Sequence, residues 1–247
     1  METNYNVGYT PGNREDRLKH CILEELLKKI KPKVYIEFHS GAGRYNINEE
    51  IYDGSSVRAL KDFYRRFKDK KGIPKVFLHE KNQANRTILK KQISALWRKT
   101  IDIVIGERWE TSAVNSFWRS KWEKDEIEEE YGIIPNSKIE KYAKNAEEML
   151  FLIDPTKIEE YTANKNIGND EMIRAFDRII NKGANVLMYV PQKKKNKTDR
   201  NTLLKIKLAL FRSGRTYDNF RFEEEGLVHN NIIVANKKVL NMLEKAA

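Results

Sequence analysis

The feature that most constrains this chain is the stretch from Val34 to Tyr45, an apolar run that ends in an acid and breaks into a Gly-x-Gly loop. The run from Val34 to Phe38 is typical of a buried parallel strand, since apolar and aromatic residues dominate it. Gly41 and Gly43 allow a sharp turn and a close approach to a ligand that a Cβ atom would prevent. Doubly wound α/β domains hold adenosine-containing cofactors with such loops, at the carboxyl ends of their strands. We therefore predict an α/β fold with a cofactor site at this loop.

The spacing of the loop narrows the type of cofactor. A dinucleotide fingerprint requires a third glycine at position 46, and Asn46 occupies that position. The pattern acid-x-x-x-Gly-x-Gly, which runs from Glu37 to Gly43, suits S-adenosylmethionine better because this ligand has no pyrophosphate. S-adenosylmethionine is therefore the predicted cofactor, and a nicotinamide oxidoreductase comes last among the alternatives. For the loop alone, an ordinary β-turn without a ligand stays open.

The charge balance points to a polyanionic partner. The chain carries 47 Lys and Arg residues against 36 Asp and Glu residues, a formal net charge of +11. Such an excess favours nucleic acid as the partner. Cys21 is the only cysteine, and no Cys/His cluster suggests a metal site. No apolar run approaches the ~18 residues that a membrane span needs, and the N-terminus lacks the pattern of a signal peptide. We expect no membrane association and a cytoplasmic location.

Strands and helices are predicted to alternate along most of the chain, which indicates a doubly wound, mostly parallel sheet covered by helices on both faces. The predicted strands cover residues 34–38, 75–80, 101–105, 149–154 and 185–190, followed by a C-terminal antiparallel strand pair at about 219–223 and 229–234. The predicted helices cover the stretch between an N-terminal arm (1–13) and Pro32, then residues 55–67, 85–99, 170–181 and 201–213. In the first helix, the expected apolar stripe includes Leu18, Cys21, Ile22, Leu26, Leu27 and Ile30. We predict one domain over residues 1–247, with a charged, aromatic helical insertion at about 109–148 as a candidate protein-binding segment.

Several polar residues stand where a parallel sheet would bring them to one edge. Glu80 ends the second predicted strand, where an acid can accept hydrogen bonds from both ribose hydroxyls of an adenosine. Asp154 and Pro155 end the fourth strand and face the same crevice, although Asx-Pro is also an ordinary turn signal. His39 lies inside the glycine loop and would line any ligand bound there. Three consecutive lysines are candidate phosphate contacts if they lie on the crevice face, namely Lys193, Lys194 and Lys195.

Several of these motifs recur together in a known family. They are Tyr5, Gly12-Asn13, Asp16 and Leu18-Lys19-His20 in the arm and first helix, His39-Ser40-Gly41-Ala42-Gly43-Arg44-Tyr45 in the loop, then Gly54-Ser55, Leu78-His79-Glu80, Leu152-Ile153-Asp154-Pro155 and the tail from Asn230 to Asn236. In this order and spacing, the chain resembles a bacterial family of adenine-N6 methyltransferases that act on large-subunit ribosomal RNA. The resemblance is dense at the N-terminus and thin between residues 100 and 148.

The resemblance implies a role for each matching residue. The residues that match the family's cofactor pocket are His20, His39, Gly41, Gly43, Ser55 and Glu80, and Glu107 stands in for an acid that holds the adenine ring. Asp154 matches the proton acceptor at the target amino group, and the Pro155 carbonyl is a second acceptor. Tyr5 matches an arm residue that meets the RNA, and we assign Lys19 to the substrate side as well.

Three positions depart from the family pattern. Thr156-Lys157 replaces the Pro-Tyr that follows the catalytic acid, so Tyr161 or Tyr189 would have to supply the stacking aromatic. A long inserted subdomain of the family is reduced here to residues 46–53, and Glu107 replaces an Asp-Gly pair. We predict a methyltransferase acting on nucleic acid, with adenine N6 of RNA as the first interpretation and of DNA as the second. A noncatalytic nucleic-acid-binding or assembly subunit on a methyltransferase fold is the alternative from another class.

Overall fold

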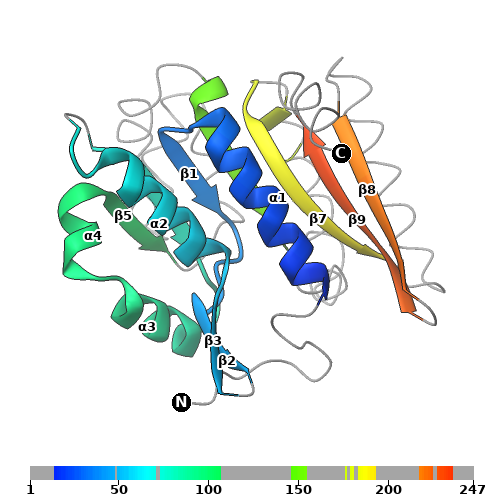
Figure 1. The fold of residues 1–247 in the computed structure, drawn as a ribbon, viewed down its shortest axis with the longest axis horizontal. Coiled ribbons are helices and arrows are strands. Elements are labelled where there is room, and N and C mark those ends of the chain that lie inside the picture. The colour runs from blue at the N-terminus through cyan, green and yellow to red at the C-terminus, as the bar shows by residue number, and fades with distance from the viewer. Residues whose placement is uncertain are drawn as a thin grey trace, which may run out of the picture.

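The computed structural model describes residues 14–47, 49–70, 73–106, 146–154, 176, 179–180, 183–192, 217–224 and 227–235. The strands of this part form a seven-stranded sheet (Figure 1) in the order β5 (Asp102–Gly106), β4 (Lys75–His79), β1 (Val34–Glu37), β6 (Met149–Ile153), β7 (Asn185–Gln192), β9 (Leu227–Ala235) and β8 (Tyr217–Glu224). The first five of these strands are mutually parallel, whereas β9 is antiparallel to both β7 and β8. The predicted fold class, a doubly wound sheet that ends in an antiparallel pair, is confirmed.

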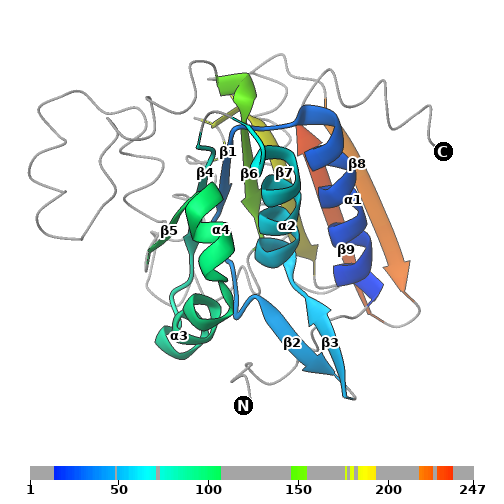
Figure 2. The ribbon, with the colours of Figure 1, turned by 60° about the vertical axis from the view of Figure 1, so that its left-hand side comes forward.

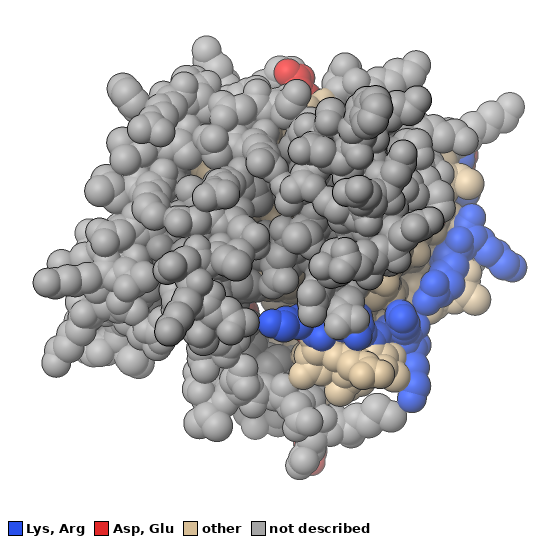
Figure 3. Space-filling view, turned by 180° about the vertical axis from the view of Figure 1, so that it is seen from behind, with Lys and Arg blue, Asp and Glu red and all other residues tan. Residues whose placement is uncertain are grey.

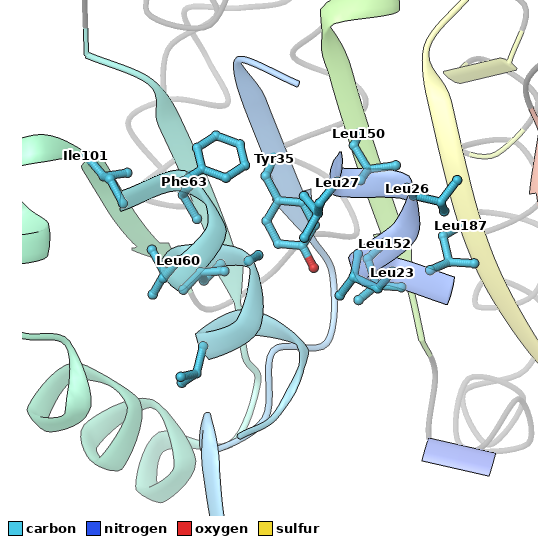
Figure 4. Close-up of a cluster of buried hydrophobic side chains, with 14 of the residues drawn as sticks. Leu23, Leu26, Leu27, Tyr35, Leu60, Phe63, Ile101, Leu150, Leu152 and Leu187 are labelled. Atoms are coloured by element: carbon cyan, nitrogen blue, oxygen red, sulfur yellow. The ribbon is translucent and has the colours of Figure 1, made fainter. Parts of the chain in front are cut away.

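Helices α1 (Arg14–Ile30) and α2 (Ser55–Phe67) cover one face of the sheet (Figures 1 and 2). The centres of their apolar stripes are fully buried, with Leu23, Leu26 and Leu27 from α1 and Leu60 and Phe63 from α2 all at 0% exposure. Figure 4 shows these side chains meeting Tyr35, Leu150, Leu152 and Leu187 of the sheet. Each buried leucine contributes about 1.5–3 kcal/mol. Because one side of each helix is buried against the sheet, its apolar residues recur at helical spacing, and this spacing predicted both helices.

Some local predictions are corrected by the structure. The predicted helix at 85–99 is two helices, α3 (Gln83–Gln92) and α4 (Ala95–Thr100). The break falls at Ser94, whose hydroxyl accepts a hydrogen bond from the Trp97 backbone N–H at 3.2 Å and so caps α4. Cys21, predicted on the apolar stripe of α1, is exposed, and Leu23 is buried in its place.

A hairpin that the sequence did not predict follows the glycine loop. It consists of β2 (Arg44–Ile47) and β3 (Glu50–Asp53), which pair in antiparallel register with Tyr45 opposite Tyr52. The hairpin lies at the carboxyl end of β1, apart from the main sheet (Figures 1 and 2).

The remaining predicted elements fall largely outside the described residues. These elements are the arm 1–13, the helix 201–213 and most of the segment 109–148. Of the segment 109–148, the structure describes only the short 3-10 helix η2 (Ala146–Glu148). Within the predicted helix 170–181, Phe176, Ile179 and Ile180 are helical and buried. Among the helices that are described, none combines the length and the apolar character that crossing a membrane requires.

Candidate functional site

The strand order of the sheet indicates where a ligand would bind. The strand order reverses at β1, which pairs with β4 on one side and with β6 on the other. Open α/β sheets bind ligands beyond the carboxyl ends of their strands at such a switch point. Glu37, the last residue of β1, is in register with Leu152 of β6, so the loop after β1 and Asp154 after β6 leave the sheet side by side. The glycine loop and Asp154 therefore leave the same edge of the sheet, at its switch point.

The backbone of the glycine loop requires glycine at both positions. Gly41 and Gly43 have φ angles of +60° and +84°, which lie in the left-handed region. A Cβ atom on Gly43 would lie 2.7 Å from Leu89 Cδ1 and 2.8 Å from Gln92 Oε1, because α3 packs directly against the loop. A Cβ atom on Gly41 would lie 2.3 Å from the Tyr45 hydroxyl. The loop is thus held tightly between α3 and the hairpin.

Glu80 is fixed by backbone groups on both of its carboxylate oxygens. Its Oε2 accepts a hydrogen bond from the Gly41 N–H at 2.8 Å, and its Oε1 accepts one from the Asn82 N–H at 2.8 Å. Burial raises the pKa of Glu80, and these two N–H groups oppose that rise. The structure therefore joins two predicted cofactor residues, Gly41 and Glu80, through a direct hydrogen bond.

A second acid, Glu37, is completely buried beneath the loop. Its oxygens accept hydrogen bonds from the Ser55 hydroxyl and, at 3.0 Å, from the Tyr35 hydroxyl. Burial raises the pKa of Glu37 to about 8, even though both hydroxyls lower it. The Glu37 carbonyl oxygen lies 3.1 Å from Nδ1 of His79, whose pKa burial lowers to about 4. Sequence reasoning assigned Glu37 no role, although it is the acid that opens the acid-x-x-x-Gly-x-Gly pattern.

Asp154 is held from the side of α1. Its Oδ2 accepts a hydrogen bond from the Lys19 ammonium, which also donates to Asp16 Oδ1 at 2.9 Å. Burial raises the pKa of Asp154, and the positive charge of Lys19 opposes the rise. The ammonium lies 5.3 Å from the centre of the Tyr189 ring, and Tyr189 stands next to Met188, the register partner of Ile153. Lys19 was predicted on the substrate side, and the structure places it as the buried partner of Asp154.

The two predicted histidines border this cluster. His20 is buried, and its pKa falls to about 3 through burial and then through the charge of Lys19. The pKa of His39 also falls to about 3, through burial and then through His79 and Lys19. Both imidazoles are therefore neutral near pH 7 and can bind a ligand only as uncharged donors or acceptors.

Other predicted site residues lie outside the described part of the chain, so they stay predictions. They are Tyr5, Glu107, Pro155, Lys193, Lys194 and Lys195, together with Thr156, Lys157 and Tyr161. Within the described part, no three His, Cys, Asp or Glu side chains gather closely enough to hold a metal ion.

The residues at the crevice fit an adenosyl ligand. The buried hydroxyl of Ser40 has no hydrogen-bond partner among the described residues, so a donor and an acceptor remain for a ligand beside Gly41. Each oxygen of Glu80 accepts one backbone N–H and keeps a further lone pair, which two ribose hydroxyls can use. The left-handed turns at Gly41 and Gly43, packed against Tyr45 and Leu89, fix the backbone beside this hydroxyl.

The strand order and the solved structures to which the chain is similar give it a Rossmann-like methyltransferase fold. A protein of Legionella pneumophila superposes with a TM-score of 0.60 at 17% identity, covering 95% of this chain and 92% of that one. An O-methyltransferase of Bacillus cereus, solved in complex with SAH, superposes with a TM-score of 0.51 at 10% identity, covering 92% of this chain and 84% of that one.

Similarity in sequence is confined to a short stretch. The ribosomal RNA large subunit methyltransferase J of Escherichia coli is 42% identical over 50 residues, which is 19% of this chain and 18% of that protein. No family model matches the chain.

Proposed function

We propose that the chain is an S-adenosylmethionine-dependent methyltransferase that acts on nucleic acid, with adenine N6 of RNA as its target. The observation that carries this proposal is the arrangement of Glu80 and Asp154 on either side of the glycine loop, at the strand ends that flank β1. The charge of +11 favours nucleic acid as the substrate, and the short match to a ribosomal RNA methyltransferase favours RNA.

The cofactor half of the site uses backbone and carboxylate groups. Glu80 accepts hydrogen bonds from the ribose hydroxyls, the turns at Gly41 and Gly43 hold the loop backbone in place beside the ligand, and Ser40 offers its hydroxyl. His39 lies in the same loop as a neutral imidazole. S-adenosylmethionine, when bound there, supplies an electrophilic methyl carbon on a sulfonium.

The acceptor half is organised by Asp154. One carboxylate oxygen is held by Lys19, which leaves the other free to accept a hydrogen from an exocyclic amino group. That hydrogen bond would direct the lone pair of the amino nitrogen toward the methyl carbon. As the N–C bond formed, the methyl–sulfur bond of the sulfonium would break and leave a neutral thioether, and the Asp154 carboxylate or water would take the proton released from the nitrogen. Because methyl transfer is an in-line displacement, holding the two reactants in this geometry is the main task of the protein.

Tyr189 is the described aromatic that can replace the one missing at 156–157. Tyr189 stands one residue beyond the register partner of Ile153, and its ring centre lies 5.3 Å from the Lys19 ammonium that binds Asp154. Stacking of a base on an aromatic ring is worth about 1–3 kcal/mol, and a base must leave its own stack to reach Asp154. A looped or single-stranded RNA permits this at the lowest free-energy cost.

The experiment is a transfer assay with methyl-labelled S-adenosylmethionine and separate pools of RNA and DNA, followed by nucleoside mass spectrometry. The proposal expects label in N6-methyladenosine from the RNA pool with the wild-type protein and none with Asp154→Asn. Label in the DNA pool alone would replace RNA by DNA as the polymer. No transfer by either protein, with nucleic acid still bound, would favour the noncatalytic binding subunit.

A further inference from the structure

Acidic residues neutralise the Lys and Arg side chains in some parts of the described chain and not in others. The segment 81–101 contains six Lys and Arg residues and no Asp or Glu. Five of these cations are exposed, namely Lys81, Lys90, Lys91, Arg98 and Lys99, and we call these five the α3–α4 basic face. None of them forms an ion pair with any residue that the structure describes.

On helices α1 and α2, in contrast, most Lys and Arg side chains form ion pairs. On these helices Lys28 pairs with Glu25 at 2.6 Å, Arg65 pairs with Asp62 at 2.7 Å, and Lys61 pairs with Asp53. Arg58 and Arg66 also have carboxylate partners. The cations on the α1–α2 side are therefore largely neutralised. On the α3–α4 side the cations repel one another unless an anion binds there.

The α3–α4 basic face begins at the cofactor edge. Lys81 directly follows Glu80, and Leu89, on the buried side of α3, packs against Gly43 of the loop. The Arg98 guanidinium lies 3.5 Å from the Lys90 carbonyl oxygen, which brings the cations of α4 next to those of α3. Figure 3 shows lysine and arginine side chains gathered on the side of the molecule where α3 and α4 lie.

The side chains of this face suit a phosphate backbone rather than bases. Trp97 is the only aromatic residue between 81 and 101, and it is buried in the core at 9% exposure. Without an exposed aromatic ring the face cannot stack bases, whereas Lys and Arg side chains bind phosphate oxygens and carry no sequence information. The ten residues of α3 extend about 15 Å, enough to follow several phosphates.

We propose that the α3–α4 basic face binds the sugar–phosphate backbone of the nucleic-acid substrate and so positions the target base at Asp154. This inference rests on the proposed function in taking the substrate to be nucleic acid. It adds a surface that neither the glycine loop nor the predicted lysines 193–195 include.

The test compares two triple variants of the full chain that lose the same charge. The first is Lys90→Ala, Lys91→Ala and Arg98→Ala, and the control is Lys28→Ala, Lys61→Ala and Lys68→Ala on the α1–α2 side. Binding of a labelled 20-nucleotide RNA of mixed sequence is measured by fluorescence anisotropy between 50 and 200 mM salt, and S-adenosylmethionine affinity is measured by calorimetry.

The basic-face triple is expected to weaken RNA binding at least tenfold at low salt. The slope of log K against log salt should fall by about 2, since each phosphate contact on a single strand contributes ~0.7. The control triple should stay within about twofold of wild type, and both should keep the wild-type affinity for S-adenosylmethionine.

Three results would overturn the inference. The first is an equal loss of RNA affinity in both triples, which would mean that only net charge matters. The second is no loss in either triple. The third is displacement of RNA by polyglutamate at the same charge concentration as by unlabelled RNA, which would assign the face to an acidic protein. Loss of RNA binding in the basic-face triple alone, in a protein that transfers no methyl group, would sustain this inference while the proposed function fails.

Discussion

The two halves of the candidate site are built by different means. Glu80 is held by two backbone N–H groups, from Gly41 and Asn82, so its position depends on the fold alone. Asp154 is held by the side chain of Lys19, a long group whose own position depends on Asp16 and on burial. Hydrogen bonds from backbone N–H groups persist through most side-chain substitutions nearby, whereas a single substitution of either partner removes an ion pair. We therefore expect cofactor binding to be robust and catalysis to be easily lost.

The strongest test of this contrast is Asp154→Asn. The variant keeps the size of the side chain but loses the carboxylate that accepts the hydrogen of the amino group. Since general acid–base groups contribute about 10²–10⁴-fold, we expect turnover to fall at least 100-fold while S-adenosylmethionine affinity is unchanged. Asp69→Asn, at an exposed carboxylate, is the matched control. Turnover near that of wild type would remove Asp154 from the reaction.

The converse test is Glu80→Ala, which should spare turnover at saturating cofactor and weaken cofactor binding. We expect a rise in Kd of tenfold or more, about 1.4 kcal/mol, because two ribose hydroxyls lose their acceptor. Calorimetric titration measures the change, with Glu147→Ala as the exposed control. Equal affinity in wild type and Glu80→Ala would exclude this residue from the pocket.

Replacing Lys19 by Met sharpens the contrast further, since the length is kept and the charge is lost. Lys19 lowers the pKa of Asp154, so its removal raises that pKa further and a higher pH is needed to ionise the carboxylate. We expect about tenfold lower turnover near neutral pH, recovery toward alkaline pH, and partial rescue by Lys19→Arg. A pH profile that does not move would mean that Lys19 serves packing alone.

The last test concerns Glu37, whose protonation affects stability and not binding or turnover. Its pKa is about 8 in the folded chain and near 4.5 in the unfolded chain, so the unfolded state loses this proton first as the pH rises. Stability from this group is full below about pH 4.5 and declines by up to about 1.4 kcal/mol per pH unit until pH 8. Glu37→Gln replaces the carboxyl group by a neutral amide that stays within reach of Ser55 and Tyr35. Because this amide does not ionise, the variant should not show the decline. Urea unfolding at pH 6.5 and 7.5 measures it, and identical pH slopes in the two proteins would contradict a buried neutral acid.

Much of the fold follows from local sequence, since periodicity predicted α2 to the residue and strand composition predicted five parallel strands. The hairpin β2–β3 was missed because its eight residues alternate weakly and depend on the loop that precedes them. The α3–α4 break was missed because Ser94 reads as an ordinary helix residue until its capping bond is known. At the site, the glycine spacing indicated the loop, but the Lys19–Asp154 pair joins residues 135 positions apart, which only the three-dimensional structure reveals.

Both halves of the proposed site depend on S-adenosylmethionine binding beside Gly41 and Glu80. The most direct test is a calorimetric titration of the wild-type protein with this ligand. We expect one site per chain with a micromolar Kd. No heat of binding at millimolar ligand would contradict it and leave the glycine loop as scaffold only.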